Sequence, residues 1–256
     1  MSQLLAEQRR RLILERIRER GAVKTSELSK LFSVSEITIR KDLQELAERG
    51  EILRTHGGAV TRDSLVFEPS YQEKIALHVE EKRRIGKAAA ALIEEDMAVF
   101  IGNGTTTMEI VHHLDPVKPF KAFTNALTHA MELADLPYVD LSVIGGHLRW
   151  KSYAMVGPLA KKALDGVYFD LVFLGADGVS PEQGITIPSL NEAETAREIM
   201  LAGQKVVIVA DHSKFGKVTH GRIAGLGEID LVITDKGVDL HHRRLLAELG
   251  VELLLV

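Results

Sequence analysis

Apolar residues recur at helical spacing in the first part of the chain and predict three short helices. Leu5, Leu12, Ile13 and Ile17 fall on one face of a helix expected over residues 4–20. A glycine follows this helix, as glycines commonly do where helices end. A second helix is expected to open at Thr-Ser-Glu (residues 25–27), which precedes further apolar positions.

The third helix has the clearest start and end. Ser35 is suited to the N-cap position, and Ile39, Leu43 and Leu46 form a stripe at i, i+4 and i+7 before the helix stops at a glycine. A strand is expected over residues 52–56, ended by two more glycines. Helix, helix, tight turn, helix and strand pair is the order of a winged helix-turn-helix domain, which we assign to residues 1–58.

Residues 59–73 have no clear period and contain a proline, so we expect a linker there. The remaining residues, 74–256, alternate short apolar runs with helical patterns. Such near-continuous apolar runs are typical of strands whose two faces are both covered. The expected strands are 98–101, 121–123, 141–144, 170–174, 205–210, 231–234 and 252–256. The predicted fold class is therefore α/β, with a small winged helix-turn-helix domain and a larger domain built on a mostly parallel sheet.

Charge is unevenly divided along a chain whose net charge is only −4. Residues 1–62 carry 13 Lys and Arg against 9 Asp and Glu, while the rest carries 19 against 27. The N-terminal part of the chain, which we call the head, is therefore basic, and the remainder is acidic. A basic domain on an otherwise acidic protein indicates that the head binds nucleic acid. Cysteine is absent, and no apolar run is long enough for a membrane span or a signal peptide, so we expect a cytoplasmic protein without a membrane partner.

The third helix has an outward face suited to double-stranded DNA. If its apolar stripe is buried, Thr38, Lys41 and Gln44 point away from the core, with Arg40 at the flank. Hydroxyl, guanidinium and ammonium groups are those that contact base edges and phosphates in the major groove. The expected DNA-contacting residues, with the N-cap and the wing included, are Ser35, Thr38, Arg40, Lys41, Gln44, Arg54 and His56. The spacing alone leaves open a small helical interaction domain with a charged outer face.

Two motifs resemble those of a known family and favour DNA binding over a small helical interaction domain. Residues 35–46, Ser-Glu-Ile-Thr-Ile-Arg-Lys-Asp-Leu-Gln-Glu-Leu, and residues 53–59, Leu-Arg-Thr-His-Gly-Gly-Ala, closely resemble the signature of the DeoR/GlpR family of bacterial transcription regulators. The resemblance implies that the helix over residues 36–49 reads an operator. We expect Asp42, an acidic member of the signature, to orient Arg40 or to cap a neighbour rather than to contact DNA.

The larger domain carries small and polar residues directly after its predicted strands. Ligands in open α/β sheets collect at the carboxyl ends of strands. The first such loop, Gly-Asn-Gly-Thr-Thr-Thr at 102–107, combines flexible backbone with hydroxyls and free amides, as a phosphate cradle does. It lacks the lysine of a nucleotide-binding P-loop and the third glycine of a dinucleotide fingerprint. A plain strand-to-helix turn remains the alternative for this loop.

Further strand ends add to the same edge of the sheet. Lys214 can neutralise a phosphate, whereas Asn125, Asp177 and Asp211 can accept hydrogen bonds from sugar hydroxyls. The expected ligand-binding residues are Asn103, Gly104, Thr105, Thr106, Thr107, Thr124, Asn125, Gly145, Gly146, Asp177, Asp211 and Lys214. We expect no metal site, because the histidine pairs 112–113 and 241–242 lack the spacing of a chelating helix face. We also expect no catalytic residue and no cofactor.

The same family resemblance implies a sugar-phosphate effector domain related in fold to ribose-5-phosphate isomerase. A sugar-phosphate isomerase with an N-terminal interaction module is the alternative function. The isomerases have a lysine in the Gly-rich stretch that follows their Gly-Ala-Asp element, and residues 184–190 here contain none. We therefore expect a regulator, in the family most often a repressor of sugar metabolism, that binds a phosphorylated sugar and acts as a homodimer or homotetramer.

Overall fold

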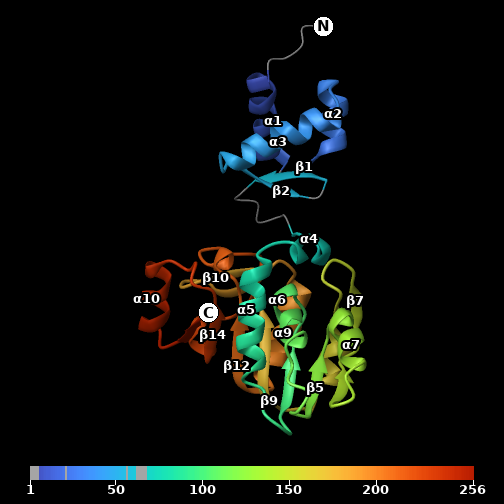
Figure 1. Cartoon of the computed structure of the whole chain (residues 1–256), viewed down its shortest axis with the longest axis vertical. Coiled ribbons are helices and arrows are strands. Elements are labelled where there is room, and N and C mark those ends of the chain that lie inside the picture. The colour runs from blue at the N-terminus through green and yellow to red at the C-terminus, as the bar shows by residue number, and fades with distance from the viewer. Residues whose placement is uncertain (1–5, 21, 56, 62–67) are drawn as a thin grey trace. The chain divides into compact units, whose positions relative to one another are not determined.

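The computed structural model describes residues 6–20, 22–55, 57–61 and 68–256 (Figure 1). The chain divides into two compact units, Met1–Pro69 and Ser70–Val256, each with its own core. In the described ranges, no helix is both long and apolar enough to cross a bilayer.

The first unit is a winged helix-turn-helix. Its helices are α1 (Ala6–Arg20), α2 (Thr25–Phe32) and α3 (Glu36–Glu48), and its antiparallel strands β1 (Ala22–Lys24), β3 (Gly58–Thr61) and β2 (Ile52–Thr55) pair in that order. The apolar stripes predicted from the sequence form its core. The largest fully buried side chains of this unit are Ile13, Ile17, Leu28, Ile39, Leu43, Leu46 and Ile52.

The wing takes more of the chain than its sequence predicts. Strand β3 (Gly58–Thr61) takes up residues 59–61 of the expected 59–73 linker, and Ala59 is fully buried in the core. Helix α4 (Tyr71–Ile75) begins within the other end of that segment. Gly58 permits the close pairing of β3 with β1, because a Cβ on it would lie 1.8 Å from the carbonyl oxygen of Val23. At both ends of this segment the structure describes short elements, β3 and α4, which are too short to show a period in the sequence.

The second unit is built on seven parallel strands in the order β15-β14-β12-β9-β4-β5-β6. Their bounds are Glu252–Leu255, Leu231–Thr234, Gly203–Val209, Phe169–Gly175, Ala98–Ile101, Phe120–Thr124 and Val139–Val143, respectively. Every parallel strand expected from the sequence is present, with end shifts of one or two residues. The predicted mostly parallel α/β domain is confirmed.

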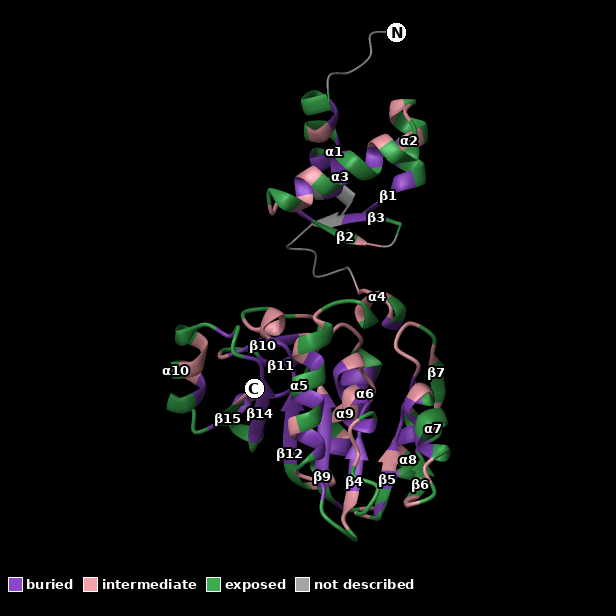
Figure 2. Cartoon of the chain, viewed as in Figure 1, coloured by how far each residue is buried: buried purple, intermediate pink, exposed green. Residues whose placement is uncertain are grey.

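Helices cover both faces of the sheet, so the central strands are buried (Figure 2). Helices α5 (Val79–Ala90) and α6 (Thr105–Val111) pack on one face with alternate strand residues such as Ile101 and Phe173. Helices α8 (Pro158–Ala163), α9 (Leu190–Leu201) and α10 (Leu240–Glu248) pack on the other, with Phe100 and Val172. Helix α7 (Leu127–Ala134) flanks the β5–β6 edge.

Small antiparallel pieces, which the sequence did not predict, lie beyond the carboxyl ends of the strands. Strands β10 (Gly178–Ser180), β11 (Gly184–Ile187) and β13 (Gly221–Ala224) form one sheet, and β7 (His147–Arg149) pairs with β8 (Ala154–Val156). A short 3-10 turn, η1 (His212–Lys214), follows β12. These pieces build up the edge at which the expected ligand residues gather.

Candidate functional site

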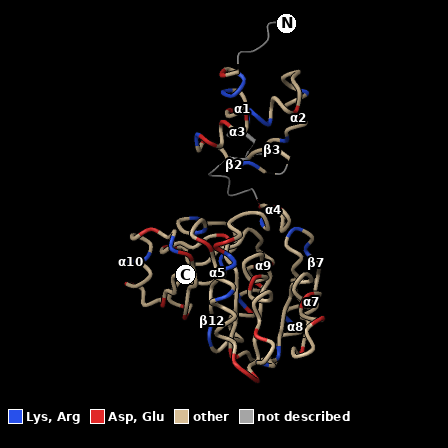
Figure 3. Tube along the Cα trace, in the orientation of Figure 1, with Lys and Arg blue, Asp and Glu red and all other residues tan. Residues whose placement is uncertain are grey.

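The outward face of α3 matches the DNA-facing surface expected from the sequence. Ser35 caps the helix by accepting a hydrogen bond from the Thr38 backbone N–H at 3.2 Å, and the two hydroxyls are 2.9 Å apart. Arg40 and Lys41 are exposed, and the Arg40 guanidinium lies 3.3 Å from Glu36 on the same helix. Basic groups are therefore displayed at the start of α3, while acidic groups also lie along α1 and α3 (Figure 3).

The wing is joined to α3 by a direct side-chain contact. Arg54 of β2 donates a hydrogen bond of 2.6 Å to the Gln44 side-chain oxygen, and the Gln44 nitrogen donates to Glu48 at 2.8 Å. Both Gln44 and Arg54 are exposed. His56, the other expected wing contact, lies outside the described residues.

Asp42 has a partner different from the one expected. Its carboxylate is 2% exposed and accepts two hydrogen bonds from Arg9 of α1, at 2.5 and 3.1 Å. Arg10 lies 3.6 Å from the same carboxylate, whereas Arg40 faces solvent. The expectation that Asp42 orients Arg40 is thus wrong: this acidic residue joins α3 to α1 inside the head. The sequence could not assign this pair because Arg9 appears there as one of three consecutive arginines.

In the second unit, the loop after β4 has the geometry of a strand-to-helix turn. Gly104 has φ +147° and precedes α6. The Thr107 hydroxyl donates to the Gly104 carbonyl at 3.0 Å and lies 3.1 Å from Nε2 of the fully buried His129. Thr107 therefore stabilises the loop from inside, and of the three threonines only Thr105 is partly exposed.

Thr124 and Asn125 of the next strand are also buried. The Thr124 hydroxyl donates to the Ile101 carbonyl at 2.7 Å, which ties β5 to β4. Asn125 donates its side-chain N–H to the Met155 carbonyl at 3.1 Å, while its side-chain oxygen has no hydrogen-bond partner in the parts of the chain described. A buried acceptor without a partner is unusual and leaves one polar atom available to a ligand.

The glycines after β6 have a packing role. A Cβ on Gly146 would lie 2.8 Å from the Val156 carbonyl oxygen, so this position admits β8 at close range. Gly145 is exposed. Nearby, Asn103 donates to Glu192 at 3.1 Å and Arg149 donates to the same carboxylate at 3.0 Å, so Asn103 belongs to an ion-pair network.

Asp177 and Lys214, which the sequence analysis places at the same sheet edge with separate ligand roles, form an ion pair, and a third residue joins them. Lys214 of η1 lies 3.3 Å from the Asp177 carboxylate, and Lys74 of α4 donates to both of its oxygens at 2.8 and 2.7 Å. Burial raises the pKa of Asp177, but the two ammonium groups outweigh this effect and hold it well below its usual range. Burial lowers the pKa of Lys214, but the attraction of Asp177 and Asp211 outweighs this effect and raises that pKa above its usual value.

Lys82 of α5 completes a cluster of three lysines. It is 5% exposed and donates a hydrogen bond to the Lys74 carbonyl. Burial lowers the pKa of Lys82 to about 8, against the attraction of Asp211. Lys74 and Lys82 were not predicted from the sequence, because they lie on helices α4 and α5 and not in loops that follow strands. We call Lys74, Lys82 and Lys214, with Asp177 and Asp211, the lysine cluster.

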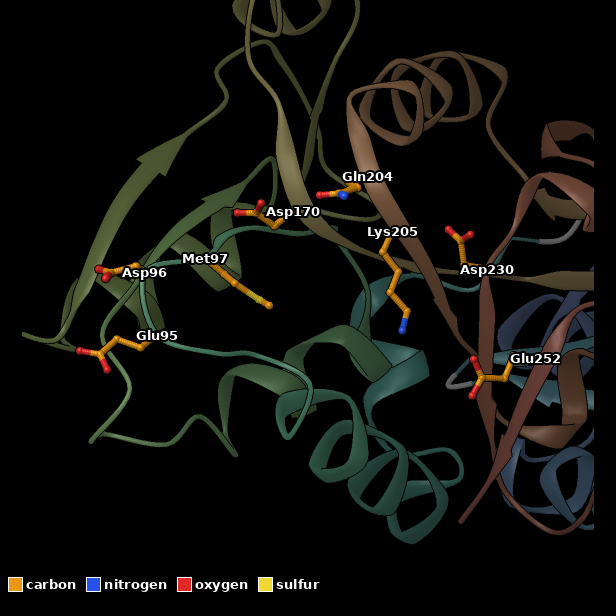
Figure 4. Close-up of a pocket in the computed structure, with 8 residues that line it drawn as sticks. All are labelled: Glu95, Asp96, Met97, Asp170, Gln204, Lys205, Asp230 and Glu252. Atoms are coloured by element: carbon orange, nitrogen blue, oxygen red, sulfur yellow. The ribbon is translucent and has the colours of Figure 1, made fainter.

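A hollow of about 760 Å³ lies at the opposite edge of the sheet, where the strands begin (Figure 4). Carboxylates dominate its lining, and two of them have structural partners: Asp170 accepts from the Ala98 backbone N–H and Asp230 from that of Val206. The lining is Glu95, Asp96, Met97, Asp170, Gln204, Lys205, Asp230 and Glu252. Such a surface repels phosphate, so we place the candidate ligand site at the lysine cluster.

A winged helix-turn-helix joined to an α/β domain with a polar, cationic strand edge defines a DNA-binding regulator with a sensor domain. Known proteins identify the family. The DeoR-like helix-turn-helix domain matches residues 9–64, and the DeoR C-terminal sensor domain matches residues 77–236. The chain belongs to the DeoR family of transcriptional regulators.

Relatives match along nearly the whole chain. The HTH-type transcriptional regulator GlpR of Haloferax volcanii is 36% identical over 97% of this chain and 97% of that protein. The HTH-type transcriptional repressor GlcR of Bacillus subtilis is 32% identical over 97% of this chain and 95% of that protein.

Solved structures similar to part of the chain include a ribose-5-phosphate isomerase and a translation initiation factor. Ribose 5-phosphate isomerase A of Methanocaldococcus jannaschii has a TM-score of 0.39 at 17% identity and covers 52% of this chain and 53% of that chain. The translation initiation factor eIF-2B of Pyrococcus horikoshii has a TM-score of 0.38 at 16% identity, over 84% and 74%. We draw no functional conclusion from similarities of this degree.

Proposed function

We propose that this DeoR-family regulator represses a sugar-metabolism operon and that a phosphorylated sugar, bound at the lysine cluster, modulates its affinity for the operator. The observation that carries the proposal is the convergence of Lys74, Lys82 and Lys214 on two carboxylates at the carboxyl edge of the sheet. Glu109 is a third carboxylate that acts on Lys82, so the three ammonium groups are largely balanced without a ligand. A dianionic phosphate group would bind by replacing Asp177 as the partner of Lys74 and Lys214.

The same edge holds acceptors for the sugar. One carboxylate oxygen of Asp211 and the side-chain oxygen of Asn125 are buried and have no partner among the described residues. Buried polar atoms gain most from a ligand hydroxyl that satisfies them. Phosphate recognition by the lysines and hydroxyl recognition by these oxygens together favour a phosphorylated sugar over inorganic phosphate.

Helix α4 could transmit the effect of ligand binding to the DNA-binding head. It carries Lys74 and is the first helix after residues 62–67 in the chain. A phosphate that competes with Asp177 for Lys74 would change the position of α4, and with it the segment that continues to the DNA-binding head. A coupling free energy of roughly 1–3 kcal/mol would change operator affinity about 5–150-fold.

We also propose that the regulator works as a homodimer or homotetramer. A single head presents one short recognition helix, and two heads on neighbouring half-sites multiply their contacts. The relative GlcR of Bacillus subtilis is a transcriptional repressor, which supports repression of transcription as the role of this regulator.

A gel-shift titration tests the proposal. The full-length protein is titrated onto the upstream region of its own operon, with a panel of phosphorylated sugars and the matching unphosphorylated sugars. We expect one phosphorylated sugar to change the midpoint and its unphosphorylated form to have no effect. A midpoint that no phosphorylated sugar changes would refute the effector part of the proposal, whereas failure to retard any fragment would refute the operator part.

A further inference from the structure

Two histidines and an aspartate gather at η1, and one of them, His78, lies far from the other two in the sequence. His78 ends the segment between α4 and α5, while Asp211 and His212 follow β12. One ligand atom from each residue lies within 4.8 Å of the other two. The two imidazole rings meet edge to face, with centroids 5.0 Å apart. Distances of this size allow small side-chain movements to bring all three groups onto one ion.

Asp211 brings an unsatisfied oxygen to this cluster. The residue is 1% exposed, and its Oδ1 accepts a hydrogen bond from the Ser213 backbone N–H at 3.0 Å. Its Oδ2 is buried and has no hydrogen-bond partner in the described part of the chain. A buried carboxylate oxygen is costly to leave unpaired, so this position favours binding of a cation or a hydrogen-bond donor.

His212 is held as metal-binding histidines commonly are. Its Nδ1 lies 2.9 Å from Oδ2 of Asp235, a buried residue, and its backbone N–H donates to Oδ1 of the same carboxylate at 2.7 Å. The carboxylate places the ring proton on Nδ1, which leaves the lone pair of Nε2 for a ligand. A carboxylate behind a histidine fixes the orientation of the ring and raises its basicity toward metals.

We propose that His78, Asp211 and His212 form a site for a divalent transition-metal ion such as Zn²⁺. Two imidazoles and one carboxylate form a donor set that Zn²⁺ accepts, and three protein ligands leave a coordination position for water or another oxygen ligand. Lys214 does not occupy the site, because its ammonium group is directed to Asp177 at 3.3 Å. With the ion bound, Oδ2 of Asp211 is no longer available to a sugar hydroxyl, and hydroxyl recognition is left to the side-chain oxygen of Asn125. Binding of the ion itself does not require the effector.

Metal binding by the full-length protein tests the site directly. The protein is stripped with a chelator and dialysed against Zn²⁺ in buffer without phosphate, and bound zinc is measured per chain. We expect one ion per chain in the wild type and loss of that ion in His78→Ala and Asp211→Asn. His220→Ala, which removes an exposed histidine outside the cluster, is the matched control and should keep it.

A second variant guards against loss through unfolding. Asp235→Asn keeps all three ligands and should weaken zinc binding about 10–100-fold. Zinc should still raise the melting temperature of each variant that binds it, which shows that the variant is folded. No stoichiometric zinc in the wild type, or unchanged zinc in His78→Ala, would overturn the proposal. Because neither sugar nor DNA is present, the result is independent of the gel-shift outcome.

Discussion

The ammonium group of Lys74 lies 2.8 and 2.7 Å from the two carboxylate oxygens of Asp177. Lys74 belongs to α4, whereas Asp177 follows β9 at the carboxyl edge of the sheet. The ion pair therefore anchors the first helix of the sensor unit to the edge where an anionic ligand is expected. An anion at this edge would compete with Asp177 for the lysine.

Replacing Lys74 should separate ligand binding from the DNA response. We expect Lys74→Met to bind the operator as the wild type does without ligand, because the head is unchanged, and to lose most of the effector-induced change in affinity. Fluorescence anisotropy with a labelled operator, with and without effector, measures both quantities. Lys87→Met, at an exposed position on α5, is the control. A full effector response in Lys74→Met would remove α4 from the mechanism.

Effector affinity should fall as the pH rises through about 8. Burial lowers the pKa of Lys82 to about 8, below its ordinary value of 10.5, so the unliganded site loses one positive charge on passing that pH. A phosphate dianion binds the charged form better, and binding should therefore weaken between pH 7 and pH 9. Calorimetric titration of the effector at several pH values measures this change. Lys82→Met should bind more weakly with a flatter profile, and a wild-type profile as flat as that of the variant would contradict the assignment.

The Arg9–Asp42 pair should be costly to break from one side. Asp42→Ala leaves a buried guanidinium without its carboxylate, and we expect the free energy of unfolding of the head to fall by about 3–5 kcal/mol. The double variant Arg9→Met/Asp42→Leu removes both charges and should recover much of that loss. Hydrogen exchange of the head amides is the suitable measurement, because the single tryptophan, Trp150, lies in the other unit. Equal losses in the single and double variants would show that the pair is not the cause.

Arg40 and Lys41 should contribute to the salt dependence of operator binding. Each phosphate contact releases counterions, so Arg40→Ala or Lys41→Ala should reduce the slope of log K against log salt by about 1. Lys121→Ala removes one positive charge from an exposed strand position in the other unit and should leave the slope unchanged. Slopes equal to that of the wild type would exclude both residues as phosphate contacts.

The central parallel strands were predictable from the sequence because both of their faces are buried, which produces continuous apolar runs such as those of β12 and β14. The head was predictable from the stripe of Ile39, Leu43 and Leu46. The short antiparallel strands were not, since three or four residues around turns carry no period. The ion pairs Arg9–Asp42 and Lys74–Asp177 were not predicted for another reason. Each joins segments that are far apart in the sequence, and the local pattern of residues does not show which distant segments meet.

The central claim is that the lysine cluster and the recognition helix are thermodynamically coupled. The most direct measurement is the dissociation constant of the effector for the full-length protein, determined once free and once saturated with operator DNA. Coupling is reciprocal, so operator should weaken effector binding by the same factor, about 5–150-fold, by which effector weakens operator binding. Equal effector affinities for the free and operator-bound protein would contradict the account.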